Sequence, residues 1–231
     1  MIAFAIFDRF HKLPAVIVSG SCCVATAAGV ATAGVVTFEN LPPTSESIRR
    51  GQNLSVPVDG FSFTSSGINP NISNAWRYYS PNPWLETYGT PAFAAGVRGT
   101  TALYSAYYDY ISPNPQYWIN RTDGSLWAFG QAYFTSVWTT GKIRLIGLRN
   151  GIEVFNFTQS ISNTQQTVVS MSSDPDAINW IDTLKITNDM VDAAARGTFI
   201  MDDMQYTLPA PGVLALVGIA GHGIRRRRCR N

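Results

Sequence analysis

The sequence predicts an all-β protein, built as a single antiparallel β-sandwich between two terminal segments of different character. Three observations point to this class. Residues with β-branched and aromatic side chains are abundant between the ends, no stretch longer than a few residues keeps helical periodicity, and turn residues recur between short runs. The chain has 231 residues, 45% hydrophobic and 14% charged. The roughly 175 residues from 34 to 208 are enough for one hydrophobic core, so we expect one domain.

Several short strands are expected within this domain. They lie near residues 35–39, 56–65, 97–107, 126–138, 142–148, 152–160, 165–172, 179–187 and 197–207. Such spacing, with turn residues between the strands, is typical of two antiparallel sheets packed face to face in a jelly-roll-like sandwich. Two stretches, 66–91 and 109–123, are rich in Pro, Asn and Tyr. We interpret them as loops at the ends of the sandwich, where binding surfaces are common.

The clearest local signal is a hairpin at Asn150-Gly151. Runs of alternating apolar residues flank this dipeptide at 143–149 and 152–157. Asn and Gly both tolerate the positive φ angles of a type I′ turn, so the two runs are expected to pair. The alternation places Ile152, Val154 and Asn156 on one face of the second strand and Glu153, Phe155 and Phe157 on the other.

Residue types that are missing from the domain exclude several kinds of chemistry. Residues 34–208 contain no Cys and no His. A disulfide is therefore excluded there, and zinc sites and Ser or Cys nucleophiles lose the residues they usually need. The same residues hold ten Lys and Arg against fourteen Asp and Glu, a net charge of −4, whereas the whole chain carries +2. An acidic domain without a basic stripe argues against nucleic acid as a partner.

Residues 1–33 have the layout of a secretory signal peptide. Basic residues within the first twelve positions precede an uncharged stretch of apolar and small residues that ends in Ala-Thr-Ala. We expect cleavage after Ala33, with a cut after Ala27 or Ala28 as an alternative. A retained membrane anchor is the other interpretation, because the uncharged stretch is about 20 residues long and would span a bilayer.

Residues 209–231 form a second segment with an order of its own. A short motif is followed by an apolar run at 213–224 and then by a basic tail. The motif is Pro209, Ala210, Pro211 and Gly212, and the tail contains Arg225, Arg226, Arg227 and Arg228. The run is shorter than an unassisted span needs, and the arginines would hold the C-terminus on the cytoplasmic side. The segment therefore predicts a short hydrophobic helix in the membrane; the alternative is a C-terminal helix with a solvated basic tail.

This C-terminal segment resembles a PEP-CTERM sorting signal, which exported proteins of Gram-negative bacteria that make exopolysaccharide carry. The family's motif is Pro-Glu-Pro, followed by a hydrophobic helix and a basic tail, and this chain departs from it at Ala210. The resemblance implies processing by an exosortase at this junction and membrane association through the segment before processing. It also implies a final location at the cell surface, in the outer membrane or in the extracellular matrix.

The domain is also similar to sandwich domains that precede such signals. The similarity rests on 36–42, the hairpin at Asn150-Gly151, 180–184 and 199–206. Related sandwiches include carbohydrate-binding modules and lectin-like jelly rolls. The resemblance therefore implies an architecture more than an activity.

Three carboxylates are candidate ligands for a structural calcium ion. Asp202 and Asp203 are adjacent on the predicted last strand, where one side chain faces in and the next faces out. Glu39 on the first strand is their expected neighbour, because first and last strands lie side by side in many sandwiches. Carboxylate and carbonyl oxygens are the ligands that Ca²⁺ prefers, and the resemblance implies the same site. The alternative is an ordinary strand end, with Asp202 and Glu39 facing water and Asp203 capping a turn.

Aromatic residues of the two irregular stretches are candidates for ligand binding. Trp76, Tyr79, Trp84 and Trp118 are the ones we select, because flat rings stack on sugar rings. The alternative is that these side chains close the ends of the core.

The sequence therefore predicts an exported cell-surface or matrix protein that binds or is embedded in exopolysaccharide, without catalytic residues. A carbohydrate-active enzyme of the same architecture, working through paired carboxylates, is one alternative. A purely structural surface protein is the other.

Overall fold

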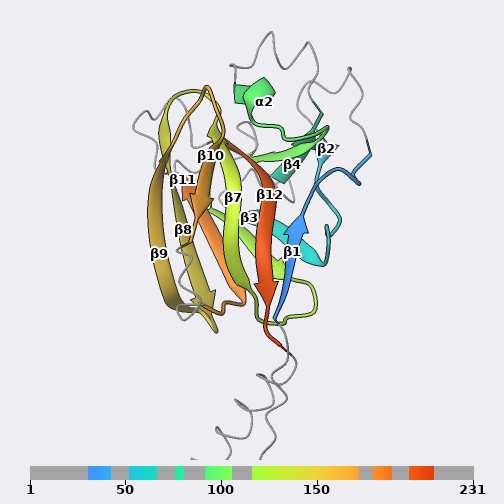
Figure 1. Cartoon of the computed structure of the whole chain (residues 1–231), viewed down its shortest axis with the longest axis vertical. Helices are drawn as coiled ribbons and strands as arrows, with labels where there is room; N and C mark the ends of the chain where they lie inside the picture. The colour runs from blue at the N-terminus through green and yellow to red at the C-terminus, as the bar shows by residue number, and fades with distance from the viewer. Residues whose placement is uncertain are drawn as a thin grey trace, which may run out of the picture.

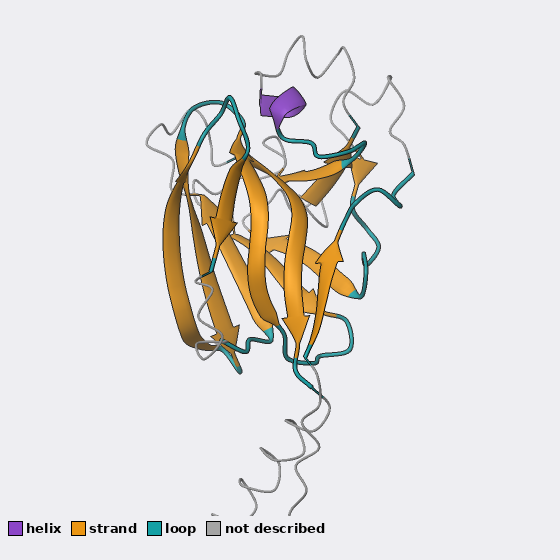
Figure 2. Ribbon diagram, in the orientation of Figure 1, coloured by secondary structure: helices purple, strands orange, loops and turns teal. Residues whose placement is uncertain are grey.

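The protein is a sandwich of two antiparallel sheets, as predicted (Figures 1 and 2). The computed structural model describes residues 31–42, 52–66, 76–80, 92–105, 116–171, 179–188 and 198–210. The seven-stranded sheet consists of β1 (Thr32–Val36), β2 (Gln52–Asn53), β4 (Trp76–Tyr79), β5 (Ala102–Ser105), β7 (Ala128–Ser136), β10 (Thr167–Ser170) and β12 (Phe199–Leu208). The five-stranded sheet consists of β3 (Phe61–Ser66), β6 (Gln116–Arg121), β8 (Gly141–Arg149), β9 (Ile152–Ile161) and β11 (Thr183–Asn188). A single helical turn, α2 (Ala92–Ala95), precedes β5.

The strand order places the longest-range pairings at the centre of each sheet. The seven-stranded sheet runs β10-β7-β12-β5-β4-β2, with β1 also paired to β12, and the five-stranded sheet runs β3-β6-β11-β8-β9. Strand β12, from the end of the domain, therefore pairs with three others, and one of them is β1. The expectation that the first and last strands lie side by side is confirmed.

Aromatic side chains fill the space between the sheets. Trp76, Tyr117 and Phe199 are fully buried and meet edge to face, with ring centroids 5.0 to 5.7 Å apart. Phe63 packs on the same Trp76 ring at 5.7 Å. Because these rings come from β3, β4, β6 and β12, the cluster ties the two sheets together across the middle of the sandwich.

The Asn150-Gly151 hairpin is confirmed. Both residues have positive φ angles, 52° and 75°, as a type I′ turn requires, and Arg149 pairs with Ile152. The predicted faces hold only in part. A bulge between Gly147 and Leu148 leaves Val154 outside the regular register, so Val154 and Phe155 both pack on the core.

A second turn of the same kind divides a stretch that we predicted as one strand. Asp59 and Gly60 have φ angles of 49° and 78°, and the backbones of Val58 and Phe61 exchange two hydrogen bonds across them. The predicted strand at 56–65 is therefore wrong in its first half. Strand β3 begins only after the turn, at Phe61.

Two strands lie in the stretches that we interpreted as loops. Strand β4 falls within 66–91, and strand β6 falls within 109–123, so both interpretations are wrong at these positions. In β6, Tyr117 and Ile119 are fully buried while the residues between and beside them are partly exposed. This period-two alternation was present in the sequence. The neighbouring Pro and Asn residues obscured it.

The two ends of the described domain meet at one strand pair. Strand β1 begins at Thr32, so Thr32 and Ala33 of the predicted signal peptide lie in the sheet, opposite Leu208 and Thr207. Strand β12 ends at Leu208. Residues 1–30 of the predicted leader, and the predicted tail from residue 211, lie outside the described residues. Within the described part of the chain, no helix has the length and apolar character of a membrane span.

The I′ turn gives a direct test of this hairpin. Replacing Gly151 by Val should lower the free energy of unfolding by about 1–3 kcal/mol, because a β-branched residue is strained at positive φ. Chemical denaturation measures the change. Asn150→Gly is the control, since Gly accepts the same φ, and it should differ from the parent by less than about 0.5 kcal/mol. Equal stability of both variants would contradict the turn assignment.

Candidate functional site

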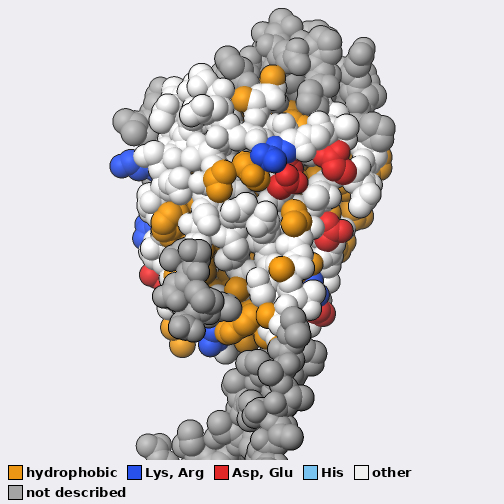
Figure 3. Space-filling model, viewed as in Figure 1, with side chains coloured by type: hydrophobic (Ala, Val, Ile, Leu, Met, Phe, Trp, Pro, Cys, Tyr) orange, Lys and Arg blue, Asp and Glu red, His pale blue; other side chains and the backbone are white. Residues whose placement is uncertain are grey.

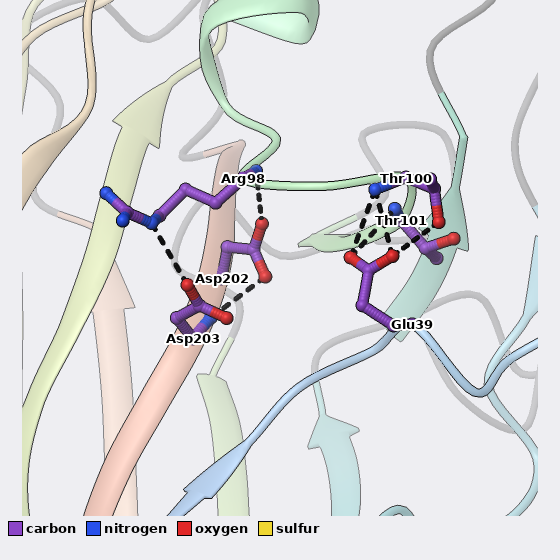
Figure 4. A network of polar contacts seen from close by, with 6 residues as sticks. All are labelled: Glu39, Arg98, Thr100, Thr101, Asp202 and Asp203. Carbon is purple, nitrogen blue, oxygen red and sulfur yellow. Dashed lines mark hydrogen bonds and ion pairs between the residues drawn. The ribbon is translucent and has the colours of Figure 1, made fainter.

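The predicted carboxylates converge on one segment, residues 98–101, which leads into β5 (Figure 4). The amide N–H of Arg98 donates to Asp202 Oδ2 at 2.7 Å, and its Nε donates to Asp203 Oδ2 at 3.0 Å. Glu39 accepts from the amide of Thr100, at 2.9 Å and 3.1 Å to its two oxygens, and also from the Thr100 hydroxyl. The three carboxylates thus fasten the 98–101 segment to β12 and to the chain after β1.

The local backbone is shaped for these contacts. Gly99 has a φ of 146°, and a Cβ at this position would collide with the carboxylate of Glu39, so only glycine fits there. Asp203 has a φ of 44° and lies where the pairing of β12 with β7 shifts register. The bulge turns the Asp203 side chain toward Arg98, whose guanidinium also lies 3.9 Å from the ring centre of Tyr133.

The pKa values of Asp202 and Glu39 are shifted in opposite directions, because Asp202 is buried more deeply. Asp202 is 1% exposed, and burial raises its pKa from 3.8 to about 7. The hydrogen bonds that it accepts from the backbone N–H groups of Arg98 and Asp203 lower the pKa, but by less than burial raises it. The charges of Asp203 and Glu39 raise it further. For Glu39, burial also raises the pKa, but the hydrogen bonds from Thr100 and Thr101 outweigh it and leave the pKa below 4.5.

These residues do not fit the predicted calcium ion. Both oxygens of Asp202 and both of Glu39 already accept hydrogen bonds from the protein, and Arg98 supplies a positive charge next to Asp203. Across the residues described in the structure, no group of three His, Cys, Asp or Glu side chains is placed to hold a metal ion. The predicted three-carboxylate cage is not formed, because the donors of the 98–101 segment occupy its place. The alternative, with Asp202 facing water, also fails, since Asp202 is buried.

The predicted aromatic residues differ in how far their side chains are buried. Trp76 and Tyr79 are fully buried, so the prediction that they present rings to a ligand is wrong, and they belong to the core as the alternative held. Trp84 lies outside the described residues. Trp118 is partly exposed and lies between the buried Tyr117 and Ile119 on β6. Its ring therefore points to the outer side of the five-stranded sheet.

Trp118 stands in a row of side chains that crosses this sheet. In register, Thr64 of β3 is opposite Trp118, Trp118 is opposite Lys185 of β11, Lys185 is opposite Ile146 of β8, and Ile146 is opposite Asn156 of β9. The next row contains Ser62, Asn120 and Thr183. We call this outer surface, centred on Trp118, the Trp118 face. It combines one aromatic ring and the buried side chain of Ile146 with hydroxyl, amide and amino groups.

A polar chain continues the Trp118 face toward the edge strand. Arg144 Nε donates to Asn156 Oδ1 at 2.9 Å, and Asn156 Nδ2 lies 3.3 Å and 3.4 Å from the carboxylate oxygens of Glu153. These contacts hold the Arg144 guanidinium beside the row of Trp118 and Lys185. Sequence reasoning missed Lys185, Arg144 and Asn156, which are far apart in the chain and are gathered by strand order.

Comparisons with known proteins show weak structural similarity. A family 29 carbohydrate-binding module from Piromyces equi is 16% identical, with a TM-score of 0.39, and 78% of this chain and 93% of that chain are covered. A family 32 carbohydrate-binding module from C. perfringens NanJ, in complex with galactose, is 12% identical, with a TM-score of 0.36 and coverage of 63% and 93%. The Stig cyclase Fisc from Fischerella sp. TAU is 8% identical, with a TM-score of 0.44 and coverage of 78% and 99%.

No protein-family model and no curated protein matches the chain. With TM-scores below 0.5, the structural similarities assign neither a family nor a function to it.

Asp202 predicts a pH dependence of stability. The pKa of Asp202 is about 7 in the folded protein, whereas in the unfolded protein it has the ordinary value of 3.8. Between these two pH values, the folded state therefore holds a proton that the unfolded state has lost. The free energy of unfolding should therefore fall as pH rises from about 4 to about 7, by up to about 4 kcal/mol from this group. Denaturation of the parent and of Asp202→Asn across this range measures it. A parent-minus-variant difference that is flat with pH would show that Asp202 is ionised throughout.

The occupied carboxylates predict indifference to calcium. The melting midpoint of the protein should be the same within about 1 °C in 5 mM CaCl₂ and in excess chelator, because Ca²⁺ would have to displace the donors of Arg98 and Thr100. A calcium ion that did bind would stabilise the folded protein by about 2.7 kcal/mol at 100 times its dissociation constant. Glu39→Gln serves as the comparison, since it removes one of the charged groups. A rise of several degrees with calcium in the parent alone would restore the predicted metal site.

Proposed function

We propose that this protein is an exported glycan-binding module of the cell surface or extracellular matrix, and that it binds through the Trp118 face. One observation carries the proposal: a tryptophan stands on the outer side of a sheet, with polar side chains in register on both sides of it. The ring gives a flat apolar surface for one sugar, and Thr64, Lys185 and Asn120 give donors and acceptors for its hydroxyls.

The position of the site on a sheet supports this function. Trp118 is set by β6, which pairs on both edges with β3 and β11, so the backbone beneath the ring is fixed before any ligand arrives. The neighbouring Tyr117 and Ile119 are anchored in the core. A site built on paired strands needs little reordering, which reduces the entropic cost of binding.

Export and sorting belong to the same proposal and rest on the sequence. The leader would send the protein out of the cytoplasm, and a cut after Ala27 or Ala28 would leave Thr32 and Ala33 in β1. The motif at 209–212, with the apolar run and basic tail that follow, would present the junction to an exosortase. Association with exopolysaccharide is consistent with a surface-exposed sugar-binding face. The membrane would hold the protein through its C-terminal segment until processing.

Replacing Trp118 by Ala tests the function. The full-length protein should lose about tenfold to a hundredfold in affinity for its glycan, because one stacked ring contributes on the order of 1.5–3 kcal/mol. Affinity electrophoresis against a panel of soluble polysaccharides gives the measurement, and thermal melting verifies that the variant is folded.

Tyr133→Ala is the matched control, since Tyr133 is a partly exposed aromatic residue on the other sheet. It should leave glycan binding unchanged. Equal binding by the parent and by Trp118→Ala would remove the Trp118 face from consideration. Release of reducing sugars from a bound polymer would favour the carbohydrate-active enzyme instead.

A further inference from the structure

Positive charge gathers on the Trp118 face although the domain as a whole is acidic. The outward positions of β8 and β11 carry Lys142, Arg144 and Lys185, alternating with the buried Ile143, Leu145, Leu184 and Ile186. Glu153 is the acidic residue at the matching outward positions of β9. These described residues give the face a net positive charge, on a domain whose sequence from 34 to 208 carries −4.

The acidic residues described above lie on the other layer. Glu39, Asp202 and Asp203 are grouped with Arg98 on the outer side of the seven-stranded sheet, and Figure 3 shows acidic and basic side chains meeting there, over the upper part of β12. This group holds three carboxyl groups and one guanidinium, whereas the Trp118 face holds three cationic side chains and Glu153. A ligand with a charge of its own would distinguish between them.

The cations lie within reach of one ligand. Lys185 is directly opposite Trp118, and neighbouring strands are about 4.7–4.9 Å apart, so Trp118 and the β8 position beside Lys185 span about 10 Å. Arg144 is two residues along β8 from Ile146, on the same outward side. A sugar stacked on Trp118 and the next one or two sugars of a chain would pass over Lys185 and Arg144.

The polar chain on β9 keeps Arg144 available for an anion. Its Nε is bonded to the Asn156 amide oxygen, and Glu153 is linked to Arg144 through the Asn156 amide rather than by a described ion pair. The terminal nitrogens of a guanidinium held in this way match the two oxygens of a carboxylate.

We propose that the glycan bound by the Trp118 face is an anionic polysaccharide whose acidic groups are carboxylates, as in uronic acids, with Lys185 and Arg144 binding these carboxylates while Trp118 stacks on a sugar ring. This inference rests on the proposed glycan-binding function and adds the chemical class of the ligand. Salt screening limits the attraction to about 8 Å at physiological ionic strength, so the cations of this face act on a bound polymer even though the domain as a whole is acidic.

The experiment compares one polymer in two charge states. The full-length protein is titrated with polygalacturonic acid and with the same polymer after chemical reduction of its carboxyl groups, in 50 mM and 500 mM NaCl. The parent should bind the acidic polymer at least tenfold more tightly at low salt, and the difference should shrink severalfold at high salt.

The variants Lys185→Gln and Arg144→Gln locate the effect. Each should weaken binding of the acidic polymer by about threefold to tenfold. Arg144→Gln should leave binding of the reduced polymer within twofold, because Arg144 has no role in binding the sugar hydroxyls. Arg77→Gln is the charge-matched control, because Arg77 lies on β4 of the other sheet, and it should change neither.

The outcomes distinguish a failure of the anionic ligand class from a failure of the glycan-binding function. In one outcome, Trp118→Ala abolishes binding, the parent binds both polymers equally, and the two cation variants behave like Arg77→Gln. The anionic class of ligand is then wrong, and the glycan-binding function stands. If Trp118→Ala has no effect on binding, both proposals fail. If neither polymer binds, the uronic-acid class is wrong, and the polysaccharide panel decides the glycan-binding function. Tighter binding of a single-stranded oligonucleotide than of the acidic polymer, lost in the same variants, would replace the polysaccharide by nucleic acid.

Discussion

The change of partner along one edge of β12 is the constraint on which the rest of the sandwich depends. Ile200 and Met201 pair with β5, whereas Met204 to Leu208 pair with β1, so the edge has a gap at Asp202 and Asp203. A gap in a central strand leaves backbone groups without a ladder partner, which is costly away from water. Here the amide of Asp203 donates to Asp202 Oδ1, and the amides of Arg98 and Thr100 donate to Asp202 and Glu39. These carboxylates connect the gap in β12 to the segment that leads into β5.

This change of partner in β12 positions the Trp118 face through the core rather than by direct contact. Strand β12 contributes Phe199 to the aromatic cluster, where it meets Tyr117 of β6 at 5.3 Å between ring centroids. Tyr117 is the chain neighbour of Trp118, on the opposite side of the same strand. The register of β12 therefore sets how β6 lies on the core, and β6 sets where the Trp118 ring stands. A buried carboxyl group on one layer and a partly exposed ring on the other belong to one packed unit.

The fold could be predicted from the sequence further than the site could. The I′ hairpin followed from Asn-Gly and the flanking alternation, which are local signals. The pairing of the first and last strands followed from the usual arrangement of sandwiches. Strands β4 and β6 were missed because Pro and Asn residues surround short runs. Glu39, Asp202 and Asp203 were correctly grouped, but the donors that occupy them come from residues 98–101, whose backbone amides carry no mark in the sequence. Lys185 and Arg144 become neighbours of Trp118 through strand order alone.

The antiparallel pairing of β1 with β12 also has a mechanical consequence. Thr32 lies opposite Leu208, so the polypeptide enters and leaves the domain at the same pole (Figure 1). Tension applied between the two ends of the chain would open this ladder one hydrogen-bonded pair at a time, starting at Thr32 and Leu208, and would not shear all five pairs together. Tension applied through either end alone does not cross the ladder. A domain held by a single terminus would therefore bear a pull at any other point of its surface without loading this strand pair across its ladder.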